Sequence, residues 1–453
     1  MIGIGIWAFI IYIFFIIGWN LLLKRSIAEA MALGLLIAAA FSGHNMIAVL
    51  KESLISAFTS NVMLAIMLFT FMSAIVTETG IIKRLVTILN SLLGRLKGGP
   101  AYISACASAL FGLIAGSGTG NAAAVGSITI PWMCQSGWSK SLAATMNAGN
   151  AGLGIAMPPS TPMLLMLSFP LVAETLTTSD VYFALASGGA WTLLWRFILI
   201  TYYVKKYNIP ALSKDQILPV STAFRTSGSS LTMFLGCIIP ICLTVGPIHT
   251  WFATMEQFGE KAIGAINIIL WVPILIALIC LIEGWRYLPK SLSGFKQILL
   301  KTRKSCSTVG GMSFFSLAGS SALAAAGFGT DFQVLLENME LPLIVMLFVI
   351  AAVIALTAGP LNGSATIIAL GSISYAALVN AGIDPVCAVV AILIFASTEG
   401  ASPPSSAPIF ISCSIAKLDK ISETFKPLVF HYVIPIVLIG ILIALGILPI
   451  VHP

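Results

Sequence analysis

The residues best suited to chemistry lie in a glycine-rich segment near the centre of an apolar run, residues 100–135. Three glycines fall within residues 116–120, and each costs a helix about 1 kcal/mol relative to alanine. In a membrane-spanning helix, such an interruption is tolerated only where the freed backbone lines a cavity or is buried in protein. We therefore expect a span that is unwound near its centre and binds a sodium ion through uncharged oxygens. The expected ligands are Gly116, Ser117, Thr119 and Asn121.

A second segment, residues 357–364, has the same character in the second half of the chain. Pro360 removes a backbone donor and glycines flank it, so this span should be interrupted too. The two interruptions predict two cation sites, or one cation site and one substrate site. Gly359 and Asn362 are assigned to the cation and Ser364 to the substrate. The first segment matches neither a phosphate-binding loop nor a dinucleotide fingerprint, because the required lysine, last glycine and acidic residue are missing.

Two double prolines, Pro158–Pro159 and Pro403–Pro404, predict a further pair of interruptions. A double proline stops a helix, and nearby hydroxyl groups satisfy the carbonyl groups left without partners. We expect a second break in each half, close to the first in space, and a plain kink is the alternative. Ser402 is assigned to the cation site. The substrate ligands expected in and near these breaks are Asn147, Asn150, Pro158, Ser160, Thr161 and Ser405.

Two charged residues, Glu399 and Arg196, fall inside apolar runs. A carboxyl group at the centre of a membrane helix costs about 2.5–3.5 kcal/mol on insertion scales, so it is a functional candidate. Glu399 is assigned to the substrate site, while a proton or cation carrier, a helix cap and a position at the membrane surface stay open. The long stem of Arg196 predicts that its guanidinium reaches the basic segment near Lys205.

A third pair of polar positions recurs in the two halves. Ser60 and Asn61 precede an apolar run, and Ser307 stands 247 residues after Ser60. We interpret these residues as tips of re-entrant hairpins that close the cation sites. Polar residues at the start of an ordinary helix are the alternative.

The composition places all these segments in a membrane protein. The 453 residues are 58% hydrophobic and 9% charged, with a mean hydropathy of +1.03. Soluble domains carry about 25% charged residues, so a soluble enzyme is excluded as the leading class. Residues 2–23 contain no charge, and residues 305–416 contain no lysine or arginine. The continuously apolar runs suffice for about 10–12 helical spans, which predicts an all-α polytopic fold.

The formal net charge of +7 comes from basic patches that separate the apolar runs. They lie at 24–25, 83–97, 205–225, 286–304 and 417–426. We expect these patches to be cytoplasmic loops and the amino terminus to face outward. Nucleic-acid binding is disfavoured because aromatic residues do not interleave with the patches. The eight cysteines form no CxxC pair and the four histidines are scattered, which disfavours a disulfide framework and any metal other than sodium.

The interruptions recur because the chain contains an internal repeat. Gly126-Ser127-Ile128 recurs as Gly371-Ser372-Ile373, and the double prolines recur at the same offset of 245 residues. Small residues that only pack helices closely would not keep a fixed register. We therefore expect two halves of inverted topology, 27–200 and 262–437, around a midplane transport site. The remaining parts are a first span (1–26), a connecting segment with a scaffold span (201–261) and a terminal end (438–453).

Several motifs stand in a fixed order along the chain: Thr79-Gly80-Ile81-Ile82-Lys83-Arg84-Leu85, Gly94-Arg95-Leu96-Lys97-Gly98-Gly99, Gly116-Ser117-Gly118, Pro158-Pro159-Ser160 and Gly382-Ile383-Asp384-Pro385. Together they resemble the large membrane subunit of the TRAP transporters, the tripartite ATP-independent periplasmic family. The resemblance implies an elevator-type secondary transporter with broken helices and re-entrant hairpins, which uses a sodium gradient to take up an organic acid. It also implies two partners, a soluble substrate-binding protein and a small integral membrane subunit, and a place in the bacterial cytoplasmic membrane.

The expected function is therefore sodium-coupled uptake of a carboxylate that a separate binding protein delivers. The alternative is a related carboxylate exchanger or ion antiporter that needs no binding protein. An intramembrane enzyme is disfavoured because the four histidines lie away from the polar interruptions. Sodium, as the coupling ion, is the only cofactor expected.

Overall fold

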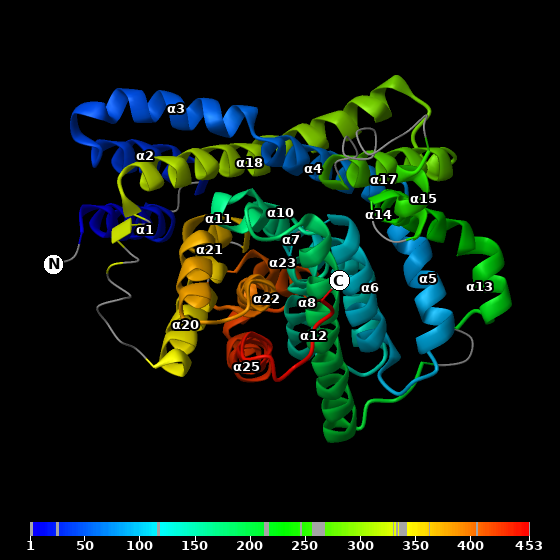
Figure 1. Ribbon diagram of the computed structural model, residues 1–453. Coiled ribbons are helices and arrows are strands. Elements are labelled where there is room, and N and C mark those ends of the chain that lie inside the picture. Colours follow the sequence, from blue (N-terminus) through cyan, green and yellow to red (C-terminus); the bar gives the residue numbers. More distant parts are fainter. Residues whose placement is uncertain are drawn as a thin grey trace.

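The computed structural model describes residues 3–23, 27–115, 118–212, 217–244, 247–255, 268–328, 330–331, 334, 342–361, 363–404 and 406–452. Within these residues the regular structure is entirely helical and contains no strand, which confirms the all-α expectation (Figure 1). Helices suit the apolar sequence because a membrane offers no water to the backbone, and a helix satisfies its own amide and carbonyl groups.

An outer group of helices runs along the top and right of Figure 1. The 34-residue α18 lies along α2, α3 and α4, while α17 packs between α4 and α14. The members of this group are α1 (Ile4–Leu23), α2 (Ile27–Ala40), α3 (Met46–Thr59), α4 (Asn61–Glu78), α5 (Ile81–Leu93), α13 (Val220–Ser227), α14 (Leu235–Thr244), α15 (Pro247–Ala253), α17 (Ile268–Gly284) and α18 (Leu292–Ala325), with 3₁₀ turns η1 (Gly43–Asn45) and η3 (Gly228–Phe234).

An inner bundle fills the centre of Figure 1 and holds most of the buried core. The 30-residue α12 flanks it, and α22 lies between α12 and α25. Its members are α6 (Gly99–Ala115), α7 (Gly118–Gln135), α8 (Lys140–Ala151), α9 (Leu153–Ala156), α10 (Thr161–Ser168), α11 (Pro170–Ala173), α12 (Thr178–Tyr207), α20 (Leu343–Leu361), α21 (Gly363–Asn380), α22 (Pro385–Ala396), η4 (Ser397–Ala401), α23 (Ala407–Ala416), η5 (Ile421–Thr424), α24 (Phe425–Leu428), the π-helical η6 (Val429–Val433) and α25 (Ile434–Ala444).

The internal repeat is confirmed helix by helix. Both bounds of α7 differ from those of α21 by 245 residues, and both bounds of α8 differ from those of α22 by the same number. Gly137 and Gly382, at equivalent positions, share a left-handed backbone with φ of 94° and 90°. Glycine adopts this conformation without the strain that a Cβ would cause. The halves also exchange contacts reciprocally, because α7 packs on α23 and α21 packs on α10.

The glycine-rich interruption separates α6 from α7, but the chain does not continue in one direction through it. The Asn121 amide on α7 donates a hydrogen bond to the Ser108 carbonyl on α6, 13 residues earlier, at 2.8 Å. In a straight helix these residues would be about 20 Å apart. The two helices therefore fold back on each other, and the expected unwound span is instead a helical hairpin. Their repeat equivalents α20 and α21 also pack together.

The double prolines do break their helices, as expected, and do not merely kink them. Residues 157–160 are non-helical between α9 and α10, and residues 402–404 are non-helical after η4. By length and composition, four described helices are long and apolar enough to cross a membrane, or five if one bent pair forms a single span.

The re-entrant tip expected at Ser307 is wrong. Ser307 is an exposed residue inside the continuous helix α18, so the chain does not turn there. Ser60 lies between α3 and α4, whose helical segments are bent by 46° relative to each other. This is a bend and not a reversal, because both helices lie along α18. Ser60 and Ser307, which are 247 residues apart, therefore differ in local structure.

Candidate functional site

The carboxylate of Glu399 connects the two halves of the chain at the helix interruptions. Glu399 lies on η4 and is only 4% exposed. Its Oε2 accepts a hydrogen bond from the Gly363 backbone N–H at 2.8 Å, and its Oε1 accepts one from the Thr119 hydroxyl at 3.4 Å. Gly363 is the first residue of α21 and Thr119 the second of α7. One side chain therefore caps α21 and contacts the start of α7.

Two glycines at equivalent repeat positions make room for this carboxylate. A Cβ on Gly118 would lie 3.2 Å from Oε1, and a Cβ on Gly363 would lie 2.9 Å from Oε2. Both distances are tighter than ordinary packing, so the carboxylate would have to move. The amino end of a helix carries partial positive charge that favours an anion, and here two such ends face one carboxylate.

Two buried oxygens lie in the first turns of the helices that begin at this carboxylate, and neither has a described donor. Asn121 and Thr366 are also separated by 245 residues, and each follows its glycine by three positions, on the same helix face. Both side chains are fully buried, and the Asn121 Oδ1 and Thr366 Oγ1 atoms have no hydrogen-bond partner among the described residues. Carbonyl and hydroxyl oxygens beside a carboxylate form a ligand set that suits a hard cation.

Other residues predicted for the cation site meet at the same place. A Cβ on Gly359, near the end of α20, would lie 2.6 Å from the Ser402 carbonyl oxygen. The Ser402 hydroxyl donates to the Thr398 carbonyl at 2.9 Å, one residue before Glu399. We refer to the residues gathered here as the tip cluster: Gly118, Thr119, Asn121, Gly359, Gly363, Thr366, Glu399 and Ser402.

The two asparagines of α8 hold the bundle together. Both are fully buried. The Asn147 amide donates to the Ala122 carbonyl on α7 at 3.0 Å and to the Ser412 hydroxyl on α23 at 2.8 Å. The Asn150 amide donates to the Ser104 hydroxyl on α6 at 3.2 Å. Their Oδ1 atoms accept nothing from the described residues, which leaves each side chain one oxygen for another partner.

The serines that follow the double prolines, Ser160 and Ser406, make different hydrogen bonds. The Ser160 hydroxyl accepts a hydrogen bond from the Met163 N–H at 3.3 Å and caps α10. Ser406 makes no side-chain cap on α23, and its hydroxyl donates instead to the backbone carbonyl of Glu399. Pro158 and Thr161 are buried in the same segment as Ser160, and Ser364 is half-buried on α21.

Several of the remaining predicted site residues fall outside the part of the chain that the structure describes. Gly116, Ser117, Asn362 and Ser405 lie outside the described residues, as does the side chain of Asn61. Two cavities of the described chain lie elsewhere. One, of about 730 Å³, is lined by Arg84 and Glu283 among others, and the second, of about 610 Å³, by Lys206 and His431 among others.

The expectation that Arg196 reaches the Lys205 segment is wrong. Arg196 is fully buried on α12. Its Nη1 donates to the Thr192 carbonyl and its Nη2 to the Gly149 carbonyl, both at 2.9 Å. Gly149 stands in the last turn of α8, where carbonyl groups carry partial negative charge that attracts a cation. The Tyr432 ring centre, 5.8 Å away, adds a cation–π contact. The guanidinium therefore ties α12 to the end of α8.

Gly118, Gly363 and Thr366 were not among the residues predicted for the site. The repeat register contained the signal, since adding 245 to Gly118 gives Gly363 and adding it to Asn121 gives Thr366.

The spacing of residues in the sequence also did not predict one group of possible metal ligands. One ligand atom each of Asp384, Cys387 and His452 lies within 4.8 Å of the others. The Asp384 carboxylate accepts the Cys387 N–H at 3.0 Å and caps α22, which accounts for part of this group.

Comparison with known families identifies the class of protein. A family model described as the tripartite ATP-independent periplasmic transporter, DctM component, matches residues 5–447. The chain belongs to this DctM family. It is therefore a multi-pass membrane transporter component and not an enzyme, as the motifs suggested.

DctM relatives resemble the chain over most of its length. The C4-dicarboxylate TRAP transporter large permease protein of Rhodobacter capsulatus is 21% identical over 76% of each chain. The protein of the same name from Pseudomonas aeruginosa is 23% identical over 75% of this chain and 74% of its own. The uncharacterized protein YgiK of Salmonella typhimurium is 25% identical over 77% of this chain and 74% of its own.

A solved structure supports the fold independently. The YdaH transporter of Alcanivorax borkumensis superposes with a TM-score of 0.58 and covers 89% of each chain. Its sequence is 16% identical, so the likeness concerns the fold alone.

Proposed function

We propose that this DctM component is the membrane permease for sodium-coupled uptake of a small organic acid. The observation that carries the proposal is the buried carboxylate of Glu399 shared by the starts of α7 and α21. A carboxylate removed from water needs donors and a compensating cation. The donors are the two helix starts, and a sodium ion is the proposed cation.

The proposed cation site extends from the tip cluster into the interruptions. Glu399, Thr119, Asn121 and Thr366 offer oxygens from both halves. The predicted ligands Gly116, Ser117 and Asn362 precede the same helix starts in the sequence. Sodium would bring the interruptions together, because each half contributes only part of the coordination shell. Glu399 thus belongs with the cation, since its negative charge would repel a substrate carboxylate.

The proposed substrate site lies at the starts of α10 and α23, after the double prolines. The α23 start lacks a side-chain cap, and the partial positive charge of this helix end favours an anion. Ser160, Thr161, Asn147 and Asn150 belong to the same bundle. C4-dicarboxylates and isethionate appear in the names of family relatives, and both are small anions. We therefore propose a carboxylate or a chemically similar acid as the substrate.

In the proposed cycle, a soluble binding protein delivers the acid and a small membrane subunit completes the permease. Sodium binds the tip cluster first and orders the interruptions, which completes the substrate site. The inner bundle then moves against the outer helices and carries the site across the membrane. The division of the chain into these two helix groups supports such a movement (Figure 1).

One observation favours a second candidate, an ion antiporter. The chain places its own carboxylate at the two helix starts, where a substrate anion would otherwise be expected. A transporter that carries only ions would need such a fixed charge. Organic acid uptake in vesicles separates the candidates, because an antiporter would show sodium movement without it.

The decisive experiment is uptake of a labelled C4-dicarboxylate by vesicles that contain the permease, its small subunit and the binding protein. We expect uptake to require an inward sodium gradient. Thr119→Val, which removes the hydroxyl that contacts Glu399, should reduce sodium-stimulated uptake. Thr129→Val on the same helix is the matched control, because its hydroxyl bonds only the Val125 carbonyl of its own helix among the described residues. Equal sodium dependence in both variants would count against the site.

A further inference from the structure

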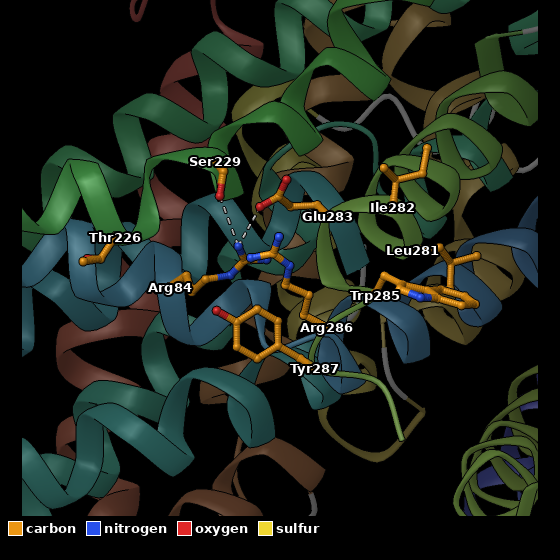
Figure 2. Close-up of a pocket in the computed structure, with 9 residues that line it drawn as sticks. All are labelled: Arg84, Thr226, Ser229, Leu281, Ile282, Glu283, Trp285, Arg286 and Tyr287. Atoms are coloured by element: carbon orange, nitrogen blue, oxygen red, sulfur yellow. Dashed lines mark hydrogen bonds and ion pairs between the residues drawn. The ribbon is translucent and has the colours of Figure 1, made fainter. Parts of the chain in front are cut away.

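The cavity beside Arg84 and Glu283 has the features of an anion site. Its volume is about 730 Å³, and Arg84 of α5, Ser229 of η3 and the end of α17 meet around it (Figure 2). Two arginines and one glutamate line it, so it carries an excess positive charge. It lies between helices of the outer group, among lining residues that the tip cluster does not share.

Arg84 has donors to spare in this cavity. Its Nη1 donates to Glu283 at 2.8 Å and to Ser229 at 3.2 Å, the dashed contacts of Figure 2. The Nε and Nη2 atoms are buried and have no hydrogen-bond partner among the described residues, while the guanidinium lies over the Tyr287 ring, 5.0 Å from its centre. These two nitrogens form one planar edge of the guanidinium, the fork that matches two oxygens of a phosphate or carboxylate. Leaving both donors unpaired is costly, so an anion that reached them would stabilise this part of the protein.

An apolar stripe on α17 leads directly to the cavity. Trp271, Ile274, Leu278 and Ile282 recur every three or four residues, and their exposure ranges from 41% for Ile274 to 78% for Ile282. This spacing places them on one helix face. Trp285 and Tyr287 continue it at the cavity mouth, where aromatic residues favour the headgroup level of a membrane. A soluble anion would not need this stripe, but the acyl chains of a lipid would lie along it.

We propose that the cavity binds the phosphate group of an anionic phospholipid, with the Arg84 fork on the phosphate and the acyl chains on the stripe. Arg286 adds a second positive charge at the mouth. Basic pockets between membrane helices on the cytoplasmic side are suited to such headgroups. The bound lipid would join α5, η3 and α17, the elements that surround the inner bundle on this side.

The test measures lipid-dependent thermal unfolding of the purified full-length chain in detergent. Phosphatidylglycerol, phosphatidylcholine and inorganic phosphate are titrated separately. We expect phosphatidylglycerol alone to raise the unfolding temperature of the natural protein. Arg84→Gln should weaken the apparent affinity at least about tenfold, because it removes a bidentate charge-assisted contact. Lys83→Gln is the control, since it removes an equal charge from an exposed neighbour on the same helix.

Two further variants keep the test informative if Arg84→Gln folds poorly. Arg84→Lys keeps the charge but lacks the fork, and its affinity should stay well below that of the natural protein. Ile282→Asn leaves Arg84 in place but interrupts the stripe, and it should weaken binding of long-chain phosphatidylglycerol. Unchanged affinity in the Arg84 variants, or equal stabilisation by phosphatidylcholine, would overturn the proposal. Equal stabilisation by inorganic phosphate would make the cavity a soluble-anion site and overturn the lipid assignment. Sodium transport does not enter this measurement.

Discussion

Glu399→Gln separates the charge of the tip cluster from its shape. The amide has nearly the same size and still offers an oxygen to the Gly363 N–H, so the helix cap should survive. The attraction between a carboxylate and a cation 4 Å away is about 4 kcal/mol at an effective dielectric constant of 20. Dehydration of the ion offsets part of this, and we expect the sodium affinity to fall at least about tenfold.

The measurement is thermal unfolding of the purified protein as sodium replaces potassium or choline. At a sodium concentration about 100 times the natural dissociation constant, binding stabilises the natural protein by about 2.7 kcal/mol. A tenfold weaker site gains about 1.4 kcal/mol, roughly half. Without sodium, the variant should unfold at the same temperature or higher, because an unpaired buried charge is gone.

Glu174→Gln is the control for this experiment, because Glu174 is exposed. Its sodium response should equal that of the natural protein. If Glu399→Gln responds to sodium as strongly as the control, the carboxylate is only a helix cap and the cation site must be sought elsewhere.

Three further predictions follow from the contacts of the bundle. Thr366→Val should leave the unfolding temperature without sodium unchanged, since its hydroxyl has no described partner, but lower the sodium response several-fold. Asn147→Leu should destabilise the protein by about 2–4 kcal/mol in denaturant unfolding, and Ser412→Ala by less, with a non-additive double variant because the two share a hydrogen bond. Gly152→Ala should prevent folding or lower the yield sharply, because its Cβ would overlap a backbone oxygen of η4. Gly311→Ala is the contrasting variant, because its Cβ would meet nothing closer than 3.7 Å, and it should stabilise α18 by about 0.5–1 kcal/mol.

The sequence predicts which parts of the chain stop being helical, but not where the chain goes next. Three glycines within residues 116–120 weaken a helix whatever follows, so the interruption was predictable. The reversal between α6 and α7 depends on the contact of Asn121 with Ser108, a pairing that local composition does not encode. The repeat register carried more information, because it gives the bounds of α21 and α22 directly from those of α7 and α8.

The two embedded charges show the same limit. The apolar sequence around Glu399 and Arg196 identifies both charges as unusual. It does not show which groups of the protein bind them. Glu399 meets the start of α21, and Arg196 meets the end of α8. Each charge therefore sits at a helix end of the favourable sign. Snorkelling was the expectation for Arg196 because the sequence shows the nearby lysine but not the carbonyl of Gly149.

The tip cluster also shows how a duplicated fold acquires a single charged site. Subtracting 245 from Glu399 gives Gly154, so the first half has no carboxylate at the equivalent place. Gly118 and Gly363, in contrast, are retained in both halves, and both contact the one carboxylate. A second carboxylate here would repel the first unless more cations bound. The two glycines therefore let the starts of α7 and α21 approach the site in the same way. Only the second half supplies a charge, the carboxylate of Glu399. Gly154→Glu tests this directly: it should destabilise the sodium-free protein in thermal unfolding and recover partly as sodium rises.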